Sequence, residues 1–426
     1  MMFDTIAIIG LGYIGLPTAT LFASRKKKVI GVDVNAHAVE TINQGRIHIV
    51  EPELDILVHA AVSEGLLRAT LVPEPADAFL IAVPTPFTGN HQPDLTYIEA
   101  AARTLAPVLR KGNLVILEST SPVGATEKLA DWLAQERPDL TFPQQAGETA
   151  DVQVAYCPER VLPGRVVHEL VSNDRVIGGM TRAATEMAIQ LYRTFVEGEL
   201  VATDARTAEM CKLTENSFRD VNIAFANELS IVCDKLGINV WELISLANRH
   251  PRVNILQPAA GVGGHCIAVD PWFIVDSAPD EARIIRTARE VNDGKPVWVL
   301  DQIKMAIEST QTVSPGKRRQ DVKVACLGLA FKPDIDDLRE SPAVGIAERL
   351  AEVGCQVLVV EPNIEALPPR LAEKNLTLVS LAQALETADV VCLLVKHRPF
   401  VEAMPDIRDH ARVIDVVGLL AAGPAR

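Results

Sequence analysis

A glycine-rich segment presents a cysteine that could act as a covalent nucleophile. Gly261, Gly263 and Gly264 stand just before Cys266, and glycines let the backbone pass close to a ligand. A thiolate adds readily to an aldehyde. Asp270 follows four residues later, so on a helical turn it would face the same way as Cys266 and could orient or deprotonate water. The alternative for a lone cysteine is a buried apolar filler.

Three polar residues with helical spacing form a second candidate group. Lys212, Asn216 and Arg219 stand at positions i, i+4 and i+7, which is one face of a helix. They could converge on one ligand, with the lysine as a general acid or base or as the group that stabilises an oxyanion. On spacing alone, a solvated helix face is the better explanation.

A glycine motif near the N-terminus predicts an NAD site. Residues 10–15 read Gly-Leu-Gly-Tyr-Ile-Gly between an apolar segment and a helical pattern, and Asp33 ends the next apolar segment. In this context Gly10 makes a tight turn, Gly12 lets the backbone approach a pyrophosphate, and Gly15 lets helix and strand pack closely. Asp33 would accept hydrogen bonds from ribose hydroxyls and repel a 2′-phosphate, which favours NAD over NADP. A glycine turn without a ligand is the alternative.

The elements that would position these groups repeat along the chain. Short apolar segments alternate with helical periodicity towards both ends, which indicates parallel sheets covered on both faces. The predicted strands are 5–9, 29–32, 78–83, 114–117, 322–328, 357–360 and 388–395. Between about 204 and 309 the periodicity is helical, and residues 312–319 have the composition of a linker. We therefore predict an α/β protein with two Rossmann-like, doubly wound parallel-sheet domains, 1–203 and 312–426, joined by a central helical domain, 204–311.

Composition excludes several classes of partner. The chain has 41 basic and 55 acidic residues and a formal charge of −14, which argues against nucleic acid and against an anionic membrane. No apolar run reaches the roughly 18 residues of a membrane helix, and we see no signal peptide, so we expect a cytoplasmic protein. The seven cysteines include no Cys-x-x-Cys pair and His265 has no partner cluster, so we expect neither a metal site nor a disulfide framework.

Six motifs together resemble the UDP-glucose/GDP-mannose dehydrogenase family from end to end of the chain. They are residues 10–15, 119–124, 157–164, 212–216, 263–266 and 331–333. Within the family, residues 158–164 and 248–254 resemble the bacterial UDP-N-acetyl-D-mannosamine dehydrogenases. UDP-glucose enzymes typically carry Phe and Glu where this chain has Arg160 and Pro163. The resemblance implies that an arginine at this position suits an acetamido sugar better than a plain hydroxyl.

The resemblance implies an NAD-dependent, four-electron oxidation at C6 of UDP-N-acetyl-D-mannosamine, for synthesis of a cell-surface polysaccharide. Cys266 would trap the C6 aldehyde as a thiohemiacetal, a second hydride transfer would leave a thioester, and water would release the uronate. Lys212, together with Asn216, is the expected acid/base and oxyanion stabiliser. Asp270 and Thr120 would position water, and Glu159 would be a further base.

The resemblance also assigns binding residues and an assembly. Expected NAD contacts are Gly10, Gly12, Tyr13, Ile14, Gly15, Asp33, Thr85, Thr126 and Arg339. Expected contacts to the UDP-sugar are Arg160, Val161, Lys212, Asn216, Arg219, His250, Arg252, Gly263, Phe331 and Lys332. The central helices are expected to form a homodimer in which Arg252 reaches the neighbouring subunit's site.

One departure and three alternatives accompany this reading. The family commonly has Asp-x-Lys-Gly near the C-terminus, whereas residues 415–418 read Asp-Val-Val-Gly, so a basic contact to the nucleotide is missing or lies elsewhere. The same chemistry could act on UDP-glucose or another UDP-acetamido sugar. A one-step β-hydroxyacid-type dehydrogenase would need neither Cys266 nor a second α/β domain. A non-enzymatic NAD- or nucleotide-sugar-binding regulator would not require the catalytic groups.

Overall fold

The first sheet is built around an apolar strand near the N-terminus. In this computed structural model, which describes residues 3–49, 51–89, 91–161, 164–264, 266–314 and 316–421, β1 (Thr5–Ile9) pairs in parallel with β2 (Lys28–Val32) and β4 (Ala78–Ile81). Among the described residues the strand order is β3-β2-β1-β4-β5-β6-β7-β8, with β6 and β7 antiparallel. The other strands are β3 (Leu67–Thr70), β5 (Leu114–Leu117), β6 (Gln153–Tyr156), β7 (Arg175–Gly179) and β8 (Leu200–Asp204).

Helices cover both faces of this sheet. Ile6 and Ile8 of β1 belong to a core that includes residues of α1, α3, α7 and α8, whereas Ala7 and Ile9 belong to a core that includes residues of α4 and α5. Alternate side chains of one strand therefore lie in two different cores, as expected for a doubly wound sheet. The helices of this part are α1 (Gly15–Ser24), α2 (Ala36–Asn43), α3 (Leu54–Ser63), α4 (Thr96–Leu105), α5 (Ala125–Glu136), α6 (Pro143–Ala146), α7 (Val166–Ser172) and α8 (Arg182–Tyr192).

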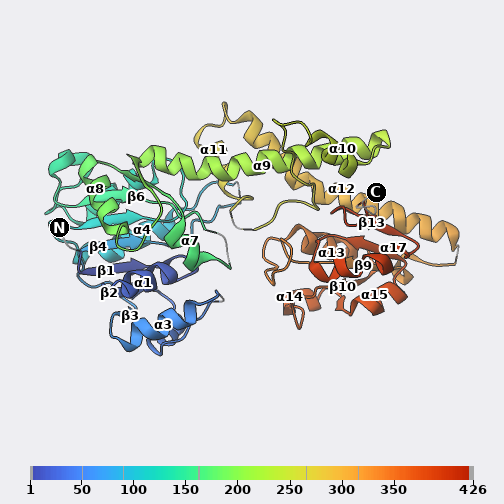
Figure 1. Cartoon of the computed structure of the whole chain (residues 1–426), viewed down its shortest axis with the longest axis horizontal. Coiled ribbons are helices and arrows are strands. Elements are labelled where there is room, and N and C mark those ends of the chain that lie inside the picture. Colours follow the sequence, from blue (N-terminus) through green and yellow to red (C-terminus); the bar gives the residue numbers. More distant parts are fainter. Residues whose placement is uncertain are drawn as a thin grey trace. The chain divides into compact units, whose positions relative to one another are not determined.

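The second sheet repeats this plan near the C-terminus (Figure 1). Its strand order among the described residues is β11-β10-β9-β12-β13, and its neighbours pair in parallel. Alternate residues of the inner strand β9 enter two cores here too. The elements are β9 (Lys323–Leu327), α13 (Pro342–Glu352), β10 (Gln356–Val360), α14 (Pro369–Ala372), β11 (Leu376–Leu378), α15 (Leu381–Thr387), β12 (Val390–Leu393), α16 (Arg398–Glu402), α17 (Met404–Arg408) and β13 (Val413–Asp415).

Helices occupy the chain between the two sheets. They are α9 (Ala205–Leu236), α10 (Val240–Ala247), α11 (Asp270–Ser277) and α12 (Arg283–Val313). The linker predicted from residue 312 therefore begins after α12 ends at Val313. By contacts the chain divides into two units, Met1–Glu215 with Asp276–Pro279, and Asn216–Val275 with Asp280–Arg426.

The turn that follows the first strand is nearly the same in both sheets. The amides of Gly10 and Gly328 each donate to the last carbonyl of the neighbouring strand at 2.8 Å, and their φ angles are 93° and 90°. The next amide donates to an acid, Asp33 in the first sheet and Glu361 in the second. The predicted α/β class with two Rossmann-like parallel sheets is confirmed. Among the described helices, none is long and apolar enough to cross a membrane.

Glu361 differs from Asp33 in having two side-chain partners, His397 and Asn363. The buried His397 places Nε2 3.0 Å from the Glu361 carboxylate, and its Nδ1 accepts a hydrogen bond from the Asp334 amide at 3.0 Å. Glu361 also accepts from the Ala330 amide at 3.0 Å. The acid at the end of β10 is therefore enclosed by partners from its own unit.

Candidate functional site

The glycine turn after β1 has the geometry of a dinucleotide site. A Cβ on Gly10 would lie 2.5 Å from the Ala82 carbonyl oxygen, and one on Gly15 would lie 1.8 Å from the Gly10 carbonyl oxygen. Both positions therefore exclude a larger side chain. A Cβ on Gly12 would have no neighbour within 4 Å among the described atoms, so this glycine leaves open space beside the start of α1. Open backbone at a helix start suits a pyrophosphate.

Two polar groups beside this turn also fit NAD. Asp33 ends β2, and its carboxylate accepts the Leu11 amide at 2.9 Å and the Asn35 amide at 2.8 Å, which holds it beside the turn. The Thr85 hydroxyl, after β4, is buried without a hydrogen-bond partner among the described residues. A buried hydroxyl without a partner is costly, and a ligand would satisfy it. Sequence analysis did not identify His48, which lies near Asp33; burial lowers its pKa although Asp33 opposes this.

Thr126 lies at the start of α5 and is fully buried. Its hydroxyl and its amide donate to Glu209 of α9 at 2.6 and 2.8 Å, and the Gly124 amide donates to the same carboxylate at 2.6 Å. Burial raises the pKa of Glu209, and these donors oppose the rise. Glu209 was not among the predicted site residues, and a single acid on a helix gave no signal for it.

Glu159 and Lys212 are charged neighbours in the first unit. Glu159 follows β6 and is buried. Its carboxylate accepts a hydrogen bond from the Arg160 amide at 2.9 Å and forms an ion pair with Arg175 at 3.0 Å. Burial raises the pKa of Glu159, and the charges of Arg175 and Lys212 oppose the rise. Thr120 follows β5 and is half-buried. A carboxylate, an ammonium and a hydroxyl are therefore positioned by strand ends and by α9.

Arg160 is held by an acid of α9. Its guanidinium contacts the Glu215 carboxylate at 2.6 and 3.1 Å and donates to the Asp174 carbonyl at 3.2 Å. Val161 is half-buried and packs against the core of the first sheet. Leu162 and Pro163 of the same motif lie outside the described residues, as does His265.

In the second unit, Cys266, Asp270 and Asn216 form a connected group. Cys266 is exposed, and the Asp270 amide donates to its carbonyl at 2.9 Å. Asp270, which begins α11, is 3% exposed. Its carboxylate accepts a hydrogen bond from the Asn216 amide group of α9 at 2.5 Å. The segment from Cys266 to Asp270 is thus one helical turn, and its buried acid is fixed by α9.

Gly263 and Gly264 permit a close approach of two loops. A Cβ on Gly263 would lie 2.4 Å from the Glu340 carbonyl oxygen and 3.0 Å from the Phe331 Cβ. Gly264 has a φ of 85°, and its Cβ would lie 3.1 Å from the Phe331 ring. The segment before Cys266 therefore packs on the loop after β9.

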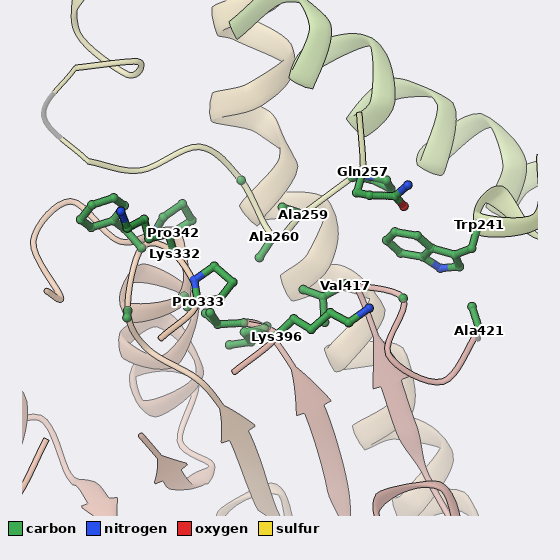
Figure 2. A pocket seen from close by; sticks show the side chains of 18 of the residues that line it. Trp241, Gln257, Ala259, Ala260, Lys332, Pro333, Pro342, Lys396, Val417 and Ala421 are labelled. Atoms are coloured by element: carbon green, nitrogen blue, oxygen red, sulfur yellow. The ribbon is translucent and has the colours of Figure 1, made fainter. Parts of the chain in front are cut away.

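A cavity of about 880 Å³ opens at the carboxyl ends of β9, β12 and β13. Lys332 and Lys396 line it, and within the described chain neither ammonium has a hydrogen bond or ion pair to protein. Ser341, just before α13, also lines it and has a buried hydroxyl without a partner among the described residues. Figure 2 shows Lys396 and Val417 over the strand ends, with Lys332 and Trp241 towards opposite sides. Two cations and a helix N-terminus suit an anionic ligand.

Four other predicted binding residues of this unit do not line the cavity. Arg219 is exposed on α9, and His250 and Arg252 are exposed in the segment after α10. Arg339 is paired with Asp337 at 2.7 Å. Phe331 does line the cavity, together with Lys332.

Family models match almost the whole chain in three consecutive segments. Residues 4–196 match the NAD binding domain of the UDP-glucose/GDP-mannose dehydrogenase family, residues 206–294 match its central domain, and residues 325–422 match its UDP binding domain. The NAD binding model contains the glycine turn, and the UDP binding model contains Lys332, Ser341 and Lys396.

Individual relatives are similar over their full length. A UDP-N-acetyl-D-mannosamine dehydrogenase from Yersinia pestis is 66% identical over 421 residues, which cover 98% of this chain and 100% of that protein. An NDP-N-acetyl-D-galactosaminuronic acid dehydrogenase from Ralstonia nicotianae is 64% identical, with 99% of this chain and 97% of that protein covered. The solved structure of a UDP-D-ManNAc dehydrogenase from Pyrococcus horikoshii has a TM-score of 0.86 at 38% identity, over 99% of this chain and 97% of that one.

The glycine turn leads to a matched pair of substitutions. Gly12→Ala should keep the thermal unfolding midpoint near that of the wild type, because its Cβ meets no described atom, and should weaken NAD binding about tenfold or more because it fills the space for the pyrophosphate. Gly10→Ala should lower the unfolding midpoint, because its Cβ would strike backbone. Calorimetric NAD titration and thermal unfolding measure both; wild-type NAD affinity in Gly12→Ala would contradict this assignment.

Proposed function

Because the chain belongs to the UDP-glucose/GDP-mannose dehydrogenase family, whose N-terminal domain binds NAD, we propose that it oxidises UDP-N-acetyl-D-mannosamine at C6 to UDP-N-acetyl-D-mannosaminuronate. The observation that carries the chemistry is the exposed Cys266 one helical turn from the buried Asp270. The choice of sugar rests on relatives of that name at 64–66% identity. The product would serve synthesis of a cell-surface polysaccharide.

Cys266 is proposed to carry the substrate between two oxidations. When bound, NAD accepts one hydride in each of them. The Cys266 thiolate adds to the C6 aldehyde made by the first oxidation and forms a thiohemiacetal, which the second oxidation converts to a thioester. Water then breaks the C–S bond and releases the carboxylate and the thiol. One substrate and one water therefore consume two NAD and yield two NADH and three protons.

We assign the proton transfers to side chains that belong to the family's sequence motifs. Lys212 and Asn216 stand one turn apart on α9 and are proposed to stabilise the developing oxyanion, with Lys212 as acid/base. Asp270, fixed by Asn216, is proposed to orient the water that attacks the thioester. Glu159 is proposed as a further base and Thr120 as a second group that positions water.

The cavity of the second unit is proposed to hold the UDP group. Lys332 and the buried Ser341 hydroxyl line this cavity near the start of α13 and are proposed to contact the UDP group. Val417 lines the same cavity where the family commonly has lysine, and Lys396 of the adjacent strand end also lines it. We assign to Lys396 the cationic contact that Val417 cannot make. The remaining proposed contacts to the sugar or diphosphate are Arg160, Val161, Arg219, His250, Arg252, Gly263 and Phe331. Two further residues, Thr126 and Arg339, stay proposed NAD contacts.

A homodimer and three domains complete the proposal. The domains are 1–203 for NAD, 204–311 for catalysis and dimerisation, and 312–426 for UDP-sugar binding. Support for the dimer comes from four large apolar side chains exposed on α9. They are Phe218, Phe225, Val232 and Leu236, with exposed fractions of 72%, 52%, 44% and 64%. Their spacing of seven, seven and four residues places them on one helix face. Arg252 is proposed to reach the partner's site.

Family membership favours this chemistry over the other two classes considered. A one-step β-hydroxyacid-type dehydrogenase has no use for a UDP binding domain, whereas residues 325–422 match one. A non-enzymatic binding protein gives no reason for the Cys266, Asp270 and Asn216 group. Family membership does not distinguish between acetamido sugars, because a 64% identical relative is named for an N-acetylgalactosaminuronic acid.

Product stoichiometry tests the proposed reaction. Purified protein with NAD and UDP-N-acetylmannosamine should form two NADH per sugar, and Cys266→Ala should abolish turnover because the thioester cannot form. UDP-glucose and UDP-N-acetylgalactosamine serve as comparison substrates. Turnover with one of these alone would replace the sugar and keep the mechanism, whereas one NADH per sugar, or full activity of Cys266→Ala, would contradict the mechanism.

Lys396→Ala tests the nucleotide pocket. Loss of one charge-assisted contact should raise KM for the UDP-sugar roughly tenfold with little change in kcat. Steady-state kinetics measure this, with Lys304→Ala as the control, since Lys304 is paired with Asp301 on α12 and does not line the cavity. An unchanged KM in Lys396→Ala would remove Lys396 from the site.

Phe225→Glu tests the proposed dimer face. A charge in the middle of the apolar α9 face should shift the protein from dimer to monomer in sedimentation experiments, because an unpaired charge is costly in an interface. Val401→Glu is the matched control, because Val401 is 44% exposed on α16. A Phe225→Glu variant that sediments as the wild type does would place the interface elsewhere.

A further inference from the structure

Five buried side chains form an ionisable cluster behind Glu159 in the first unit. Glu118 follows β5, Cys157 and Glu159 follow β6, Arg175 begins β7 and Tyr192 ends α8. Their exposed fractions lie between 0% and 8%. A buried charge needs a partner of opposite sign, and here one guanidinium serves two carboxylates.

Arg175 lies between these carboxylates and has little freedom to move. Its guanidinium is 3.0 Å from the Glu159 carboxylate and 3.9 Å from the Glu118 carboxylate. It lies over the Tyr192 ring, 4.7 Å from the centroid, and Tyr192 donates to Glu118 at 2.5 Å. One Glu159 oxygen is therefore fixed by Arg175, while the other accepts the Arg160 amide.

We propose that Arg175 is a positioning residue for Glu159, fixing the orientation of its carboxylate and supplying the positive charge behind it. The inference rests on the proposed role of Glu159 as a base. Arg175 approaches Glu159 from β7, and of the groups it contacts only Glu159 is a proposed catalytic residue. A purely structural ion pair would anchor β7 to β6 and leave the ionisation of Glu159 irrelevant to turnover.

The charges around Glu159 determine the direction in which its pKa would change if Arg175 were replaced. Burial raises the pKa of Glu159, and the charge of Arg175 is the largest influence that opposes the rise. Without that charge the carboxylate should bind a proton at higher pH. The neighbouring titratable groups are Lys212, Glu169, Glu118, Cys157 and Tyr192. Burial raises the pKa of Glu118 to about 7 and that of Cys157 to about 12, so both are neutral in mildly acid solution.

The pH dependence of kcat/KM distinguishes positioning from a structural role. In the wild type kcat/KM should fall on the acid side as Glu159 takes up a proton, and Glu159→Gln should lower kcat/KM and abolish this fall. Arg175→Met should move the midpoint of the fall upward by about one pH unit or more, and Arg175→Lys should restore most of the shift. Tyr192→Phe is the matched control, because it removes a hydrogen bond to Glu118 and leaves Arg175 between the two acids; its midpoint should equal that of the wild type.

Two further measurements keep the outcomes separate. If Arg175→Met does not fold, the double variant Glu118→Gln/Arg175→Met replaces it, because it buries one carboxylate fewer; Glu118→Gln alone is its reference, and thermal unfolding checks each protein. A folded Arg175 variant with the reference midpoint would overturn the positioning role. An unchanged acid-side fall in Glu159→Gln would instead show that Glu159 is not the base, which would remove the premise of the inference.

Discussion

The turn after the first strand of each sheet determines where the chain leaves that sheet. In both sheets a glycine at positive φ bends the chain, and its amide donates to the last carbonyl of the neighbouring strand. The following amide donates to an acid. This arrangement fixes where the chain leaves the sheet. Because the neighbouring strands run parallel, the loops that follow them also lie at their carboxyl ends. The NAD turn and the cavity of the second unit both lie at such ends.

Sequence patterns predicted what depends on short-range chemistry. The glycine spacing of residues 10–15 and the four-residue interval from Cys266 to Asp270 follow from one turn of chain, and the structure has both geometries. The strands 5–9 and 114–117 were predicted to the residue, because they are continuous apolar runs. The fold class followed from their alternation with helices.

Contacts between residues that are far apart in the sequence could not be predicted from local sequence patterns. Glu209 caps the start of α5 from 83 residues away, and Arg175 lies on a strand that pairs antiparallel with β6, against the parallel pattern of its neighbours. Lys396 enters the cavity only because β12 ends beside β13. Each contact depends on strand order, which hydrophobic periodicity does not contain.

The enclosure of Glu361 by His397 shows how two copies of one architecture can diverge. The second sheet keeps the glycine turn and the terminal acid, yet the side chains of His397 and Asn363 contact that acid in addition to the backbone amides around it. An internal imidazole thus contacts the acid that corresponds to Asp33, the residue predicted to accept ribose hydroxyls in the first sheet. The second sheet therefore keeps the hydrogen-bonding pattern of the first turn, while the cavity at the same carboxyl edge is lined by different groups, Lys332, Ser341 and Lys396.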